Sequence, residues 1–268
     1  MDYDHIILEK KDGVAWLTLN RPQALNALAP DTHRQLQHAL LEIDKDPEVR
    51  VVVITGAGRA FCAGGDLKYI SAQKDDPKTI AAYGQLFHDT FYIMEHMSKV
   101  IIAMVNGLCY AGGIELMEAC DLAYAAEDIM LGDQHATYGL TPGGGGSQRL
   151  PRLMPLRKAK ELLFTGEWIS AKDAEQWGLI NKAVPADKLR DHVMVVVNKL
   201  LQRSPMASKY IKYAVNRGMQ VDLYTGLEIE KAASMAHFQT EDSIEGISSF
   251  MEKRKPNFPC RKPAWRQR

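Results

Sequence analysis

CYAGGIELMEACDLAYAAEDIMLGDQHATYGLTPGGGGSQRL, residues Cys109–Leu150, is the stretch that decides the fold. It holds a Gly-Gly turn at Gly112-Gly113 and four glycines at Gly143–Gly146, and the earlier stretch Val49–Lys68 (VRVVVITGAGRAFCAGGDLK) also runs from strand-like residues into a Gly-Gly turn. Glycine has no side chain, so such turns expose backbone N–H groups, and two turns can aim them at one point. That arrangement suits an oxyanion better than a metal ion or a nucleotide phosphate.

A carboxylate lies inside the apolar segment that follows the first of these turns. Residues 112–120 are apolar except for Glu115 and Glu118, and Glu115 falls in the first turn of a predicted helix. A buried carboxylate without a partner is protonated more easily, which suits general acid–base catalysis. Next to an enolate held by N–H groups, it could move a proton at the neighbouring carbon or activate water. The alternative is a glutamate that caps the helix or meets an arginine.

The composition is that of an ordinary globular chain. Its 268 residues are 46% hydrophobic and 25% charged, which allows one large domain or a domain with an appendage. Lys and Arg together number 33, as do Asp and Glu, so there is no basic field and we expect no nucleic-acid partner.

We expect neither a targeting segment nor a membrane span. The start, MDYDHIILEKK, lacks the layout of a signal peptide, and the longest apolar run, Val100–Ile114, is shorter than the ~20 residues that cross a bilayer. No C-x-x-C spacing is present, so the cysteines are expected to be free thiols in a reducing cytoplasm. These cysteines are Cys62, Cys109, Cys120 and Cys260.

Hydrophobic periodicity predicts alternating strands and helices, then helices alone. A hairpin is expected at Asp12-Gly13, followed by a helix from Pro30. Further strands are predicted at Val51–Ile54, Val100–Val105, Leu122–Ala125 and Leu179–Val184, and helices at Thr79–Met97, Gly112–Ala119, Arg157–Phe164, Ala171–Trp177, Leu189–Leu201, Met206–Asn216, Leu223–Phe238 and Asp242–Lys253. The alternation predicts an α/β core of βαβ units over residues 1–200 and a helical region for assembly over residues 201–268.

Several common motifs fail on single residues. Gly56-Ala57-Gly58 follows a strand, but the third glycine of a dinucleotide fingerprint is replaced by Phe61. The four glycines before Ser147 lack the lysine of a phosphate loop, and Ser147 is not in G-x-S-x-G. No H-E-x-x-H or Cys/His cluster has ligand spacing, so we expect no metal.

Together these segments resemble the crotonase superfamily, typified by enoyl-CoA hydratase, almost from end to end. The matching motifs are NRPQALNAL (Asn20–Leu28), ITGAGRAFCAGGDLK (Ile54–Lys68), VNGLCYAGGIELMEACDLAYA (Val105–Ala125), PGGGGSQRLPRL (Pro142–Leu153), TGEWISAKDAEQWGLIN (Thr165–Asn181) and FMEKRKPNF (Phe250–Phe258). The resemblance implies a ββα spiral core with a C-terminal helical trimerisation region, and trimers that usually pair into hexamers. It also implies an acyl-CoA thioester substrate and no metal or redox cofactor.

The resemblance also implies a set of site residues. The oxyanion-hole amides fall on Gly65 and Gly112. The CoA and thioester path is expected along Ala63, Gly64 and Asp66, the adenine end near Ala27 and Leu28, and further CoA contacts at Phe250 and Lys253, often from a neighbouring subunit. For Lys253, the alternative is a solvated cation near the chain end.

Glu115 matches the first catalytic glutamate of the family, but the second glutamate is missing. Its position, seven residues before Pro142, is occupied by His135, with Asp133 and Tyr138 as other candidates for the missing acid. Histidine titrates near neutrality and can exchange a proton. Alternatively, His135 only lines the acyl pocket while Glu115 does the acid–base work.

The function that the resemblance favours is an enoyl-CoA hydratase, a carbon–oxygen lyase. Because His135 replaces the glutamate, crotonyl-CoA hydration is expected to be slow, and a specialised dienoyl- or aryl-CoA hydratase is an alternative. Double-bond isomerisation is weakened by the same replacement, whereas C–C hydrolysis or decarboxylation stays open. A silent CoA-binding or RNA-binding relative is disfavoured by the retained Glu115 and the zero net charge. Aromatic side chains that could line an acyl pocket, or simply belong to the core, are Tyr69, Phe87, Tyr92 and Trp168.

Overall fold

The larger of the two sheets in the structure has six strands. The computed structural model describes residues 2–258. The strand order is β1-β2-β3-β5-β7-β10, with β1 antiparallel to β2 and every other pair parallel. The strands are β1 (Ile6–Lys11), β2 (Val14–Leu19), β3 (Val51–Gly56), β5 (Val100–Val105), β7 (Leu122–Ala126) and β10 (Lys182–Val184).

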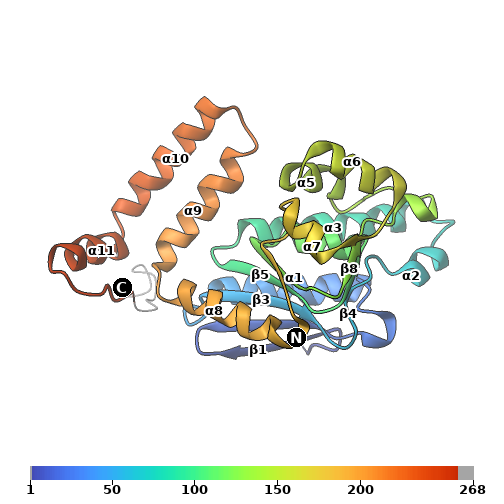
Figure 1. The fold of residues 1–268 in the computed structure, drawn as a ribbon, viewed down its shortest axis with the longest axis horizontal. Coiled ribbons are helices and arrows are strands. Elements are labelled where there is room, and N and C mark those ends of the chain that lie inside the picture. The colour runs from blue at the N-terminus through green and yellow to red at the C-terminus, as the bar shows by residue number, and fades with distance from the viewer. Residues whose placement is uncertain (1, 259–268) are drawn as a thin grey trace.

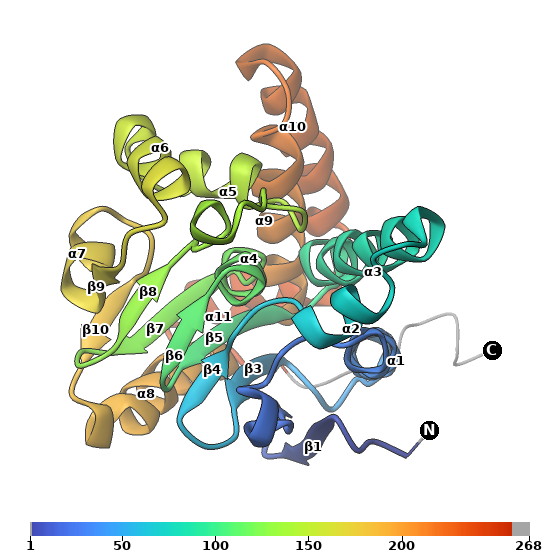
Figure 2. The same ribbon diagram turned by 90° about the vertical axis from the view of Figure 1, so that its right-hand side faces the viewer.

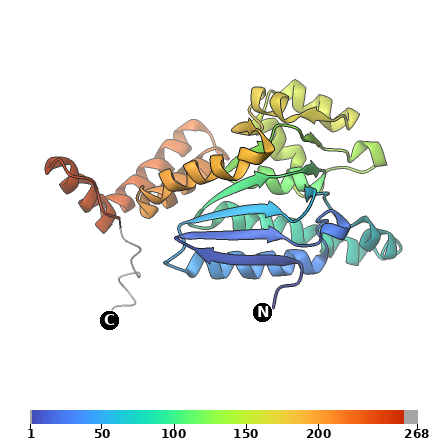
Figure 3. The same cartoon turned by 60° about the horizontal axis from the view of Figure 1, so that its bottom comes forward.

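Both faces of this sheet are covered, which explains why its strands are almost continuously apolar. Side chains alternate along a strand, so those of β2 pack on both faces. Ala15 and Leu17 pack in the cluster that includes helix α1 (Pro30–Lys45), while Val14 and Trp16 pack with residues of helix α8 (Leu189–Leu201) such as Val193. Figure 3 shows these two helices on opposite sides of the sheet.

A second, smaller sheet lies beside the first. Its order is β4-β6-β8-β9, with β4, β6 and β8 mutually parallel and β9 antiparallel to β8. The strands are β4 (Ala60–Cys62), β6 (Leu108–Tyr110), β8 (Met130–Gly132) and β9 (Ile169–Ser170). Each of β3, β5 and β7 is followed by one strand of the small sheet and then a helix, so the core consists of successive ββα units.

Helices enclose the two sheets and then leave them. In Figure 1, α9, α10 and α11 extend away from the sheets, and Figure 2 shows α4 amid the strands of the core. The helices are α1 (Pro30–Lys45), α2 (Leu67–Ala72), α3 (Pro77–His96), α4 (Gly112–Glu118), α5 (Gly146–Leu153), α6 (Leu156–Thr165), α7 (Ala171–Gln176), α8 (Leu189–Leu201), α9 (Pro205–Gly218), α10 (Leu223–Phe238) and α11 (Glu241–Met251), with short 3-10 turns η1 (Pro22–Ala24), η2 (Ala136–Tyr138) and η3 (Ala186–Lys188). In the described chain, no helix combines the length and the apolar character needed to cross a bilayer.

The predicted fold class and nearly all predicted elements are confirmed. Asp12 and Gly13 have φ of 51° and 81°, as a tight hairpin turn requires, and α8 and α10 have the predicted bounds. The small sheet and α5 were not predicted, because strands of two or three residues carry no period and α5 begins with Gly146 and contains Pro151. The division at residue 200 stays a prediction; α8 ends at Leu201 and α9 begins at Pro205.

Candidate active site

A cavity of about 290 Å³ opens where the three parallel strands of the small sheet end. Loops after β4 and β6 supply its floor, α2 and α3 one wall, and the chain from residue 134 to 144 another. Its lining residues are Ala63, Gly65, Leu67, Ile70, Ile80, Tyr83, Gly84, Phe87, Tyr110, Ala111, Gly112, Glu115, Gln134, His135, Tyr138, Leu140, Thr141, Gly143 and Gly144. The predicted residues Ala63, Gly65, Gly112, Glu115 and His135 are therefore brought together.

The loops that carry Gly65 and Gly112 touch through their backbones. A Cβ placed on Gly112 would lie 3.2 Å from the nitrogen of Gly65, and one on Gly64 would lie 2.8 Å from the nitrogen of Gly112. Gly64 also has a φ of 90°, so it tolerates no side chain on either count. Ala111, with φ 49° and ψ −125°, holds a strained conformation just before the second amide. Two amides thus lie side by side at the cavity.

Glu115 is buried, with 1% of its surface exposed, and its carboxylate has defined partners. Its Oε1 accepts hydrogen bonds from the amide of Gly144 at 2.8 Å and from that of Gly146 at 2.9 Å. A Cβ on Gly144 would come within 2.6 Å of Oε2, so this close approach requires glycine. The Gly143–Gly146 turn therefore holds a carboxylate, while the other two glycine turns meet at the cavity. The sequence left open that Glu115 caps its own helix or meets an arginine. The contacts of its carboxylate are instead with these two backbone amides.

An ion pair fixes the loop that holds Glu115. Arg149 donates from Nη1 to the carbonyl oxygen of Gly144 at 2.7 Å and from Nε to Oε1 of Glu95 at 2.7 Å. Both side chains are mostly buried, and Arg149 also lies over the ring of Phe91. The loop Gly143–Gly146 is thus linked to α3 through Arg149 and hydrogen-bonded to the carboxylate of Glu115.

His135 lines the cavity and Asp133 supports it from behind. The imidazole Nδ1 and the Oδ1 of Asp133 are 3.0 Å apart, and the amide of His135 donates to the same oxygen at 3.3 Å. Burial lowers the pKa of His135, but the hydrogen bond and charge of Asp133, with the charge of Glu115, outweigh it and leave the pKa raised. Of the alternative acids, Asp133 does not line the cavity, whereas Tyr138 lies at its mouth, 66% exposed.

The backbone around Leu28 supports the loop that carries Gly65. Leu28 donates to the carbonyl of Gly64 at 2.7 Å and forms a parallel bridge with Gly65. The hydroxyl of Tyr83 donates to the Leu28 carbonyl and accepts from the amide of Asp66 at 2.8 Å. Leu28 is fully buried and its N–H and C=O are engaged, so in this structure it positions the loop.

Asp66 closes the same loop as the N-cap of α2. Its Oδ1 accepts from the amides of Lys68 and Tyr69, and its Oδ2 pairs with Arg21 at 2.9 Å. Burial raises the pKa of Asp66, but the Tyr69 amide and the Arg21 guanidinium hold it below its ordinary value. Arg21 also donates to the carbonyl of Ala27, so it links Ala27 to Asp66, two of the residues predicted to contact CoA.

Phe250 and Lys253 do not reach the cavity within one chain. Phe250 is 81% exposed on α11, and Lys253 follows that helix with a φ of 54°. In Figure 1, α11 lies at the opposite end of the molecule from α2.

Of the four aromatic residues considered for the pocket, only Phe87 lines it. The pocket interpretation is wrong for the other three, because they are not among the residues that line the cavity. Tyr69 packs against Tyr83, Tyr92 stacks on His96 at an exposed position, and Trp168 packs against Tyr110.

Comparisons with known proteins show the family of this chain. Residues 9–261 match the family model described as enoyl-CoA hydratase/isomerase. The chain belongs to this family, and so to the crotonase superfamily. It is 39% identical to the crotonyl-CoA hydratase of Syntrophomonas wolfei (96% of this chain, 99% of that one) and 40% identical to the short-chain-enoyl-CoA hydratase of Clostridium acetobutylicum (95% and 97%). A crystal structure of enoyl-CoA hydratase from Bacillus anthracis superimposes with a TM-score of 0.91 at 36% identity, covering 96% of this chain and 100% of that one.

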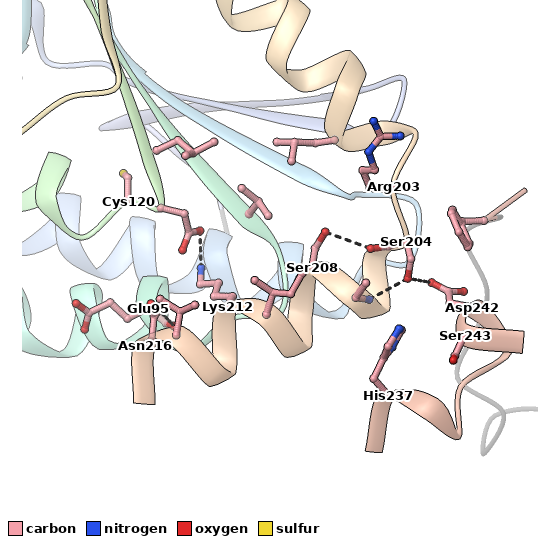
Figure 4. Close-up of a pocket in the computed structure, with 18 of the residues that line it drawn as sticks. Glu95, Cys120, Arg203, Ser204, Ser208, Lys212, Asn216, His237, Asp242 and Ser243 are labelled. Carbon is pink, nitrogen blue, oxygen red and sulfur yellow. Dashed lines mark hydrogen bonds and ion pairs between the residues drawn. The ribbon is translucent and has the colours of Figure 1, made fainter. Parts of the chain in front are cut away.

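A larger cavity in this crotonase chain, about 990 Å³, lies between the C-terminal helices and the core. Figure 4 shows its polar side chains engaged with one another: Lys212 with Asp121 at 2.8 Å, and Ser204 with Asp242 at 2.5 Å. Gly65, Gly112 and Glu115 do not line it. Despite its size, it is therefore not the cavity where the predicted site residues come together.

The sequence suggested that Glu115 could be an isolated buried carboxylate, but Glu115 has two amide partners, and the carboxyl group without a partner is that of Glu118, one helical turn later. Within residues 2–258, neither of its carboxyl oxygens has a hydrogen-bond partner. Burial above all, and then the charge of Glu115, raise the pKa of Glu118 well above its ordinary value, although Arg149 opposes them. Burial thus favours the protonated form of Glu118, whereas Glu115 accepts hydrogen bonds from two amides.

Sequence reasoning also missed the supports of the site, namely Tyr83, Arg21 and the Arg149–Glu95 pair. Of these residues, Arg149 could have been suggested by the sequence, because it closely follows the four glycines Gly143–Gly146. The free thiols are confirmed for the described cysteines: Cys62 and Cys109 are buried and Cys120 is half-buried, while Cys260 lies outside the described residues.

We predict that Glu118→Met stabilises the fold more at pH 8 than at pH 5. A pKa raised on folding gives stability that is full below the unfolded value of 4.5 and is lost as pH rises toward the folded value. Methionine removes this loss, so the free energy of unfolding should rise by about 1–3 kcal/mol at pH 8 and by less at pH 5. Urea unfolding at both pH values measures it. Glu161→Met, on the exposed side of α6, should change little; a Glu118→Met protein less stable at pH 8 would contradict the interpretation.

Proposed function

We propose that this protein is an enoyl-CoA hydratase, a lyase that adds water across the α,β-double bond of an acyl-CoA thioester. One observation carries the proposal: the buried Glu115 carboxylate and the amides of Gly65 and Gly112 share one cavity. The names of the Syntrophomonas and Clostridium relatives support it.

The two amides would bind the thioester carbonyl oxygen. As water adds, that oxygen gains negative charge, and losing one such donor typically costs about 3–4 kcal/mol. Within residues 2–258, no hydrogen bond joins the amide nitrogen of Gly65 or Gly112 to a protein acceptor. Both donors are therefore available to a substrate.

Glu115 and His135 would divide the proton transfers between them. The Glu115 carboxylate, with Oε1 held by two amides, accepts a proton from water as the water oxygen bonds to Cβ. The His135 imidazolium gives its proton to Cα. The proton on Glu115 then returns to His135, so the substrate gains one water and the enzyme is unchanged.

Other reactions of the fold are weaker candidates. Isomerisation in the family depends on a carboxylate at the position of His135, and C–C hydrolysis or decarboxylation would need a substrate that already carries a β-keto or carboxyl group. The names of the two relatives favour a short acyl chain, although His135 leaves dienoyl- and aryl-CoA as alternatives. Product mass separates these reactions, because hydration adds water, isomerisation adds nothing and decarboxylation removes carbon dioxide.

The CoA part of the substrate would lie along Ala63, Gly64 and Asp66, with its adenine end near Ala27 and Leu28. No metal and no redox cofactor is part of the proposed reaction. The free cysteines fit a reducing cytoplasm as its location.

We further propose a homotrimer, which could pair into a hexamer. The C-terminal helices expose a large apolar surface that a single chain leaves uncovered, with Leu223, Tyr224 and Phe250 each at least 75% exposed. Because Phe250 and Lys253 lie far from their own cavity, a neighbouring subunit would supply them to the CoA site.

Glu115→Gln should abolish hydration of crotonyl-CoA, because the amide cannot accept the proton from water. The loss should exceed about 100-fold in kcat. A steady-state assay that follows loss of the conjugated double bond measures it. A Glu115→Gln enzyme with the wild-type rate would show that Glu115 is not the base, and a wild-type enzyme without turnover on enoyl-CoA thioesters would refute the hydratase proposal.

Gly144→Ala should lower kcat by about 100-fold, since the new methyl would lie 2.6 Å from Glu115 Oε2 and displace the carboxylate. Gly143→Ala is the matched control, because the same methyl there meets nothing within 4 Å and most of the activity should remain. Equal activity of both variants would show that the position of Glu115 does not depend on this loop.

The assembly proposal predicts a particle of about 90 kDa, or about 180 kDa for paired trimers, from the chain mass of 30.0 kDa. Light scattering after size-exclusion chromatography measures this mass. Phe250→Asp should raise the KM for the CoA substrate. A monomer with full activity would contradict both the assembly and the shared site.

A further inference from the structure

Asp133 lies behind His135 and has no contact with the cavity itself. It is 1% exposed, and its Oδ1 receives both the backbone amide and the ring Nδ1 of His135, at 3.3 and 3.0 Å. His135 lines the cavity and its side chain is 13% exposed. The imidazole is thus fixed by one carboxylate oxygen on the side away from the substrate.

This contact determines which ring nitrogen carries the hydrogen. An ionised carboxylate only accepts hydrogen bonds, so the nitrogen that faces Asp133 must be Nδ1–H. In the neutral ring, Nε2 is then the basic nitrogen and the one left to exchange a proton.

We propose that Asp133 is a positioning residue that holds His135 in the Nδ1–H form, so that Nε2 exchanges the proton at Cα of the substrate. The inference rests on the proposed hydratase function and adds to it a second carboxylate that never touches the substrate. It also explains how histidine can replace the second glutamate of the family and still exchange a proton at Cα of the substrate.

The charged surroundings of His135 support this assignment. Asp133 faces it from the end of β8 and Glu115 from α4, and both carboxylates favour the protonated ring, whereas burial disfavours it. The phenols of Tyr110 and Tyr138 line the same cavity, and no lysine or arginine side chain does within the described chain.

The pH dependence of the reaction follows from this balance. Hydration needs His135 protonated and Glu115 ionised, so the rate falls on the alkaline side as His135 loses its proton. Removing the Asp133 charge lowers the pKa of His135 and therefore moves this alkaline limb to lower pH.

Asp133→Asn is the decisive variant, because it keeps the shape and removes the charge. We expect its alkaline limb for crotonyl-CoA hydration to lie about one pH unit lower. We expect kcat to fall at least about tenfold, with little change in KM. Asp187→Asn removes an equal charge at an exposed position and should leave the profile unchanged. Circular dichroism melting checks that both variants are folded.

Nuclear magnetic resonance of ¹⁵N-histidine-labelled enzyme, with His135→Gln for assignment, measures the tautomer and the titration midpoint of His135 without substrate. The wild-type neutral ring should be Nδ1–H, and the titration midpoint should be lower in Asp133→Asn. A wild-type Nε2–H form, or a midpoint and alkaline limb unmoved in Asp133→Asn, overturns the inference while hydratase activity stands. A wild-type enzyme inert on enoyl-CoA refutes the hydratase function instead, and the titration still decides whether Asp133 controls His135.

Discussion

The parallel pairing of β4, β6 and β8 is the constraint on which the site depends. Each strand has three residues, and each ends two to three residues before a group of the site: Gly65, Gly112 and His135. Neighbouring parallel strands lie about 4.8 Å apart, so the residues beyond their carboxyl ends must be close together. Each short strand follows a strand of the large sheet along the chain: β4 follows β3, β6 follows β5 and β8 follows β7. The core thus brings three loops, distant in sequence, to one cavity.

Two glutamates on one short helix show how local partners decide chemistry. Glu115 and Glu118 are both buried on α4, but only Glu115 meets backbone amides, and these come from a loop about 30 residues later. Glu118 has no hydrogen-bond partner in the described chain, and its burial, followed by the charge of Glu115, raises its pKa. Two ionised carboxylates this close would repel each other in a poorly solvated site. The raised pKa of Glu118 reduces this repulsion, because it favours the neutral form of that carboxyl group.

The parts of the fold that the sequence predicted are those governed by local chemistry. The hairpin follows from Asp12-Gly13 and the long helices from their apolar stripes, so their bounds are close to those observed. The small sheet could not be predicted, because three residues define no period. Glu115 and His135 could be named from the resemblance, but the partners of Glu115 and the isolation of Glu118 depend on packing between segments far apart in sequence. The roles of the site residues therefore remain predictions, supported by their position around one cavity.

The replacement of glutamate by histidine at position 135 also fits the charge of the whole cluster. Asp133 acts electrostatically on Glu118 and on His135, and Glu115 acts on both as well. A glutamate at position 135 would place a third carboxyl group beside Asp133 and Glu115, and no lysine or arginine lines the cavity in the described chain. A protonated histidine instead brings a positive charge to the cluster and still offers a proton. Asp133 and His135 are therefore best understood as one unit, because each offsets part of the electrostatic cost of burying the other.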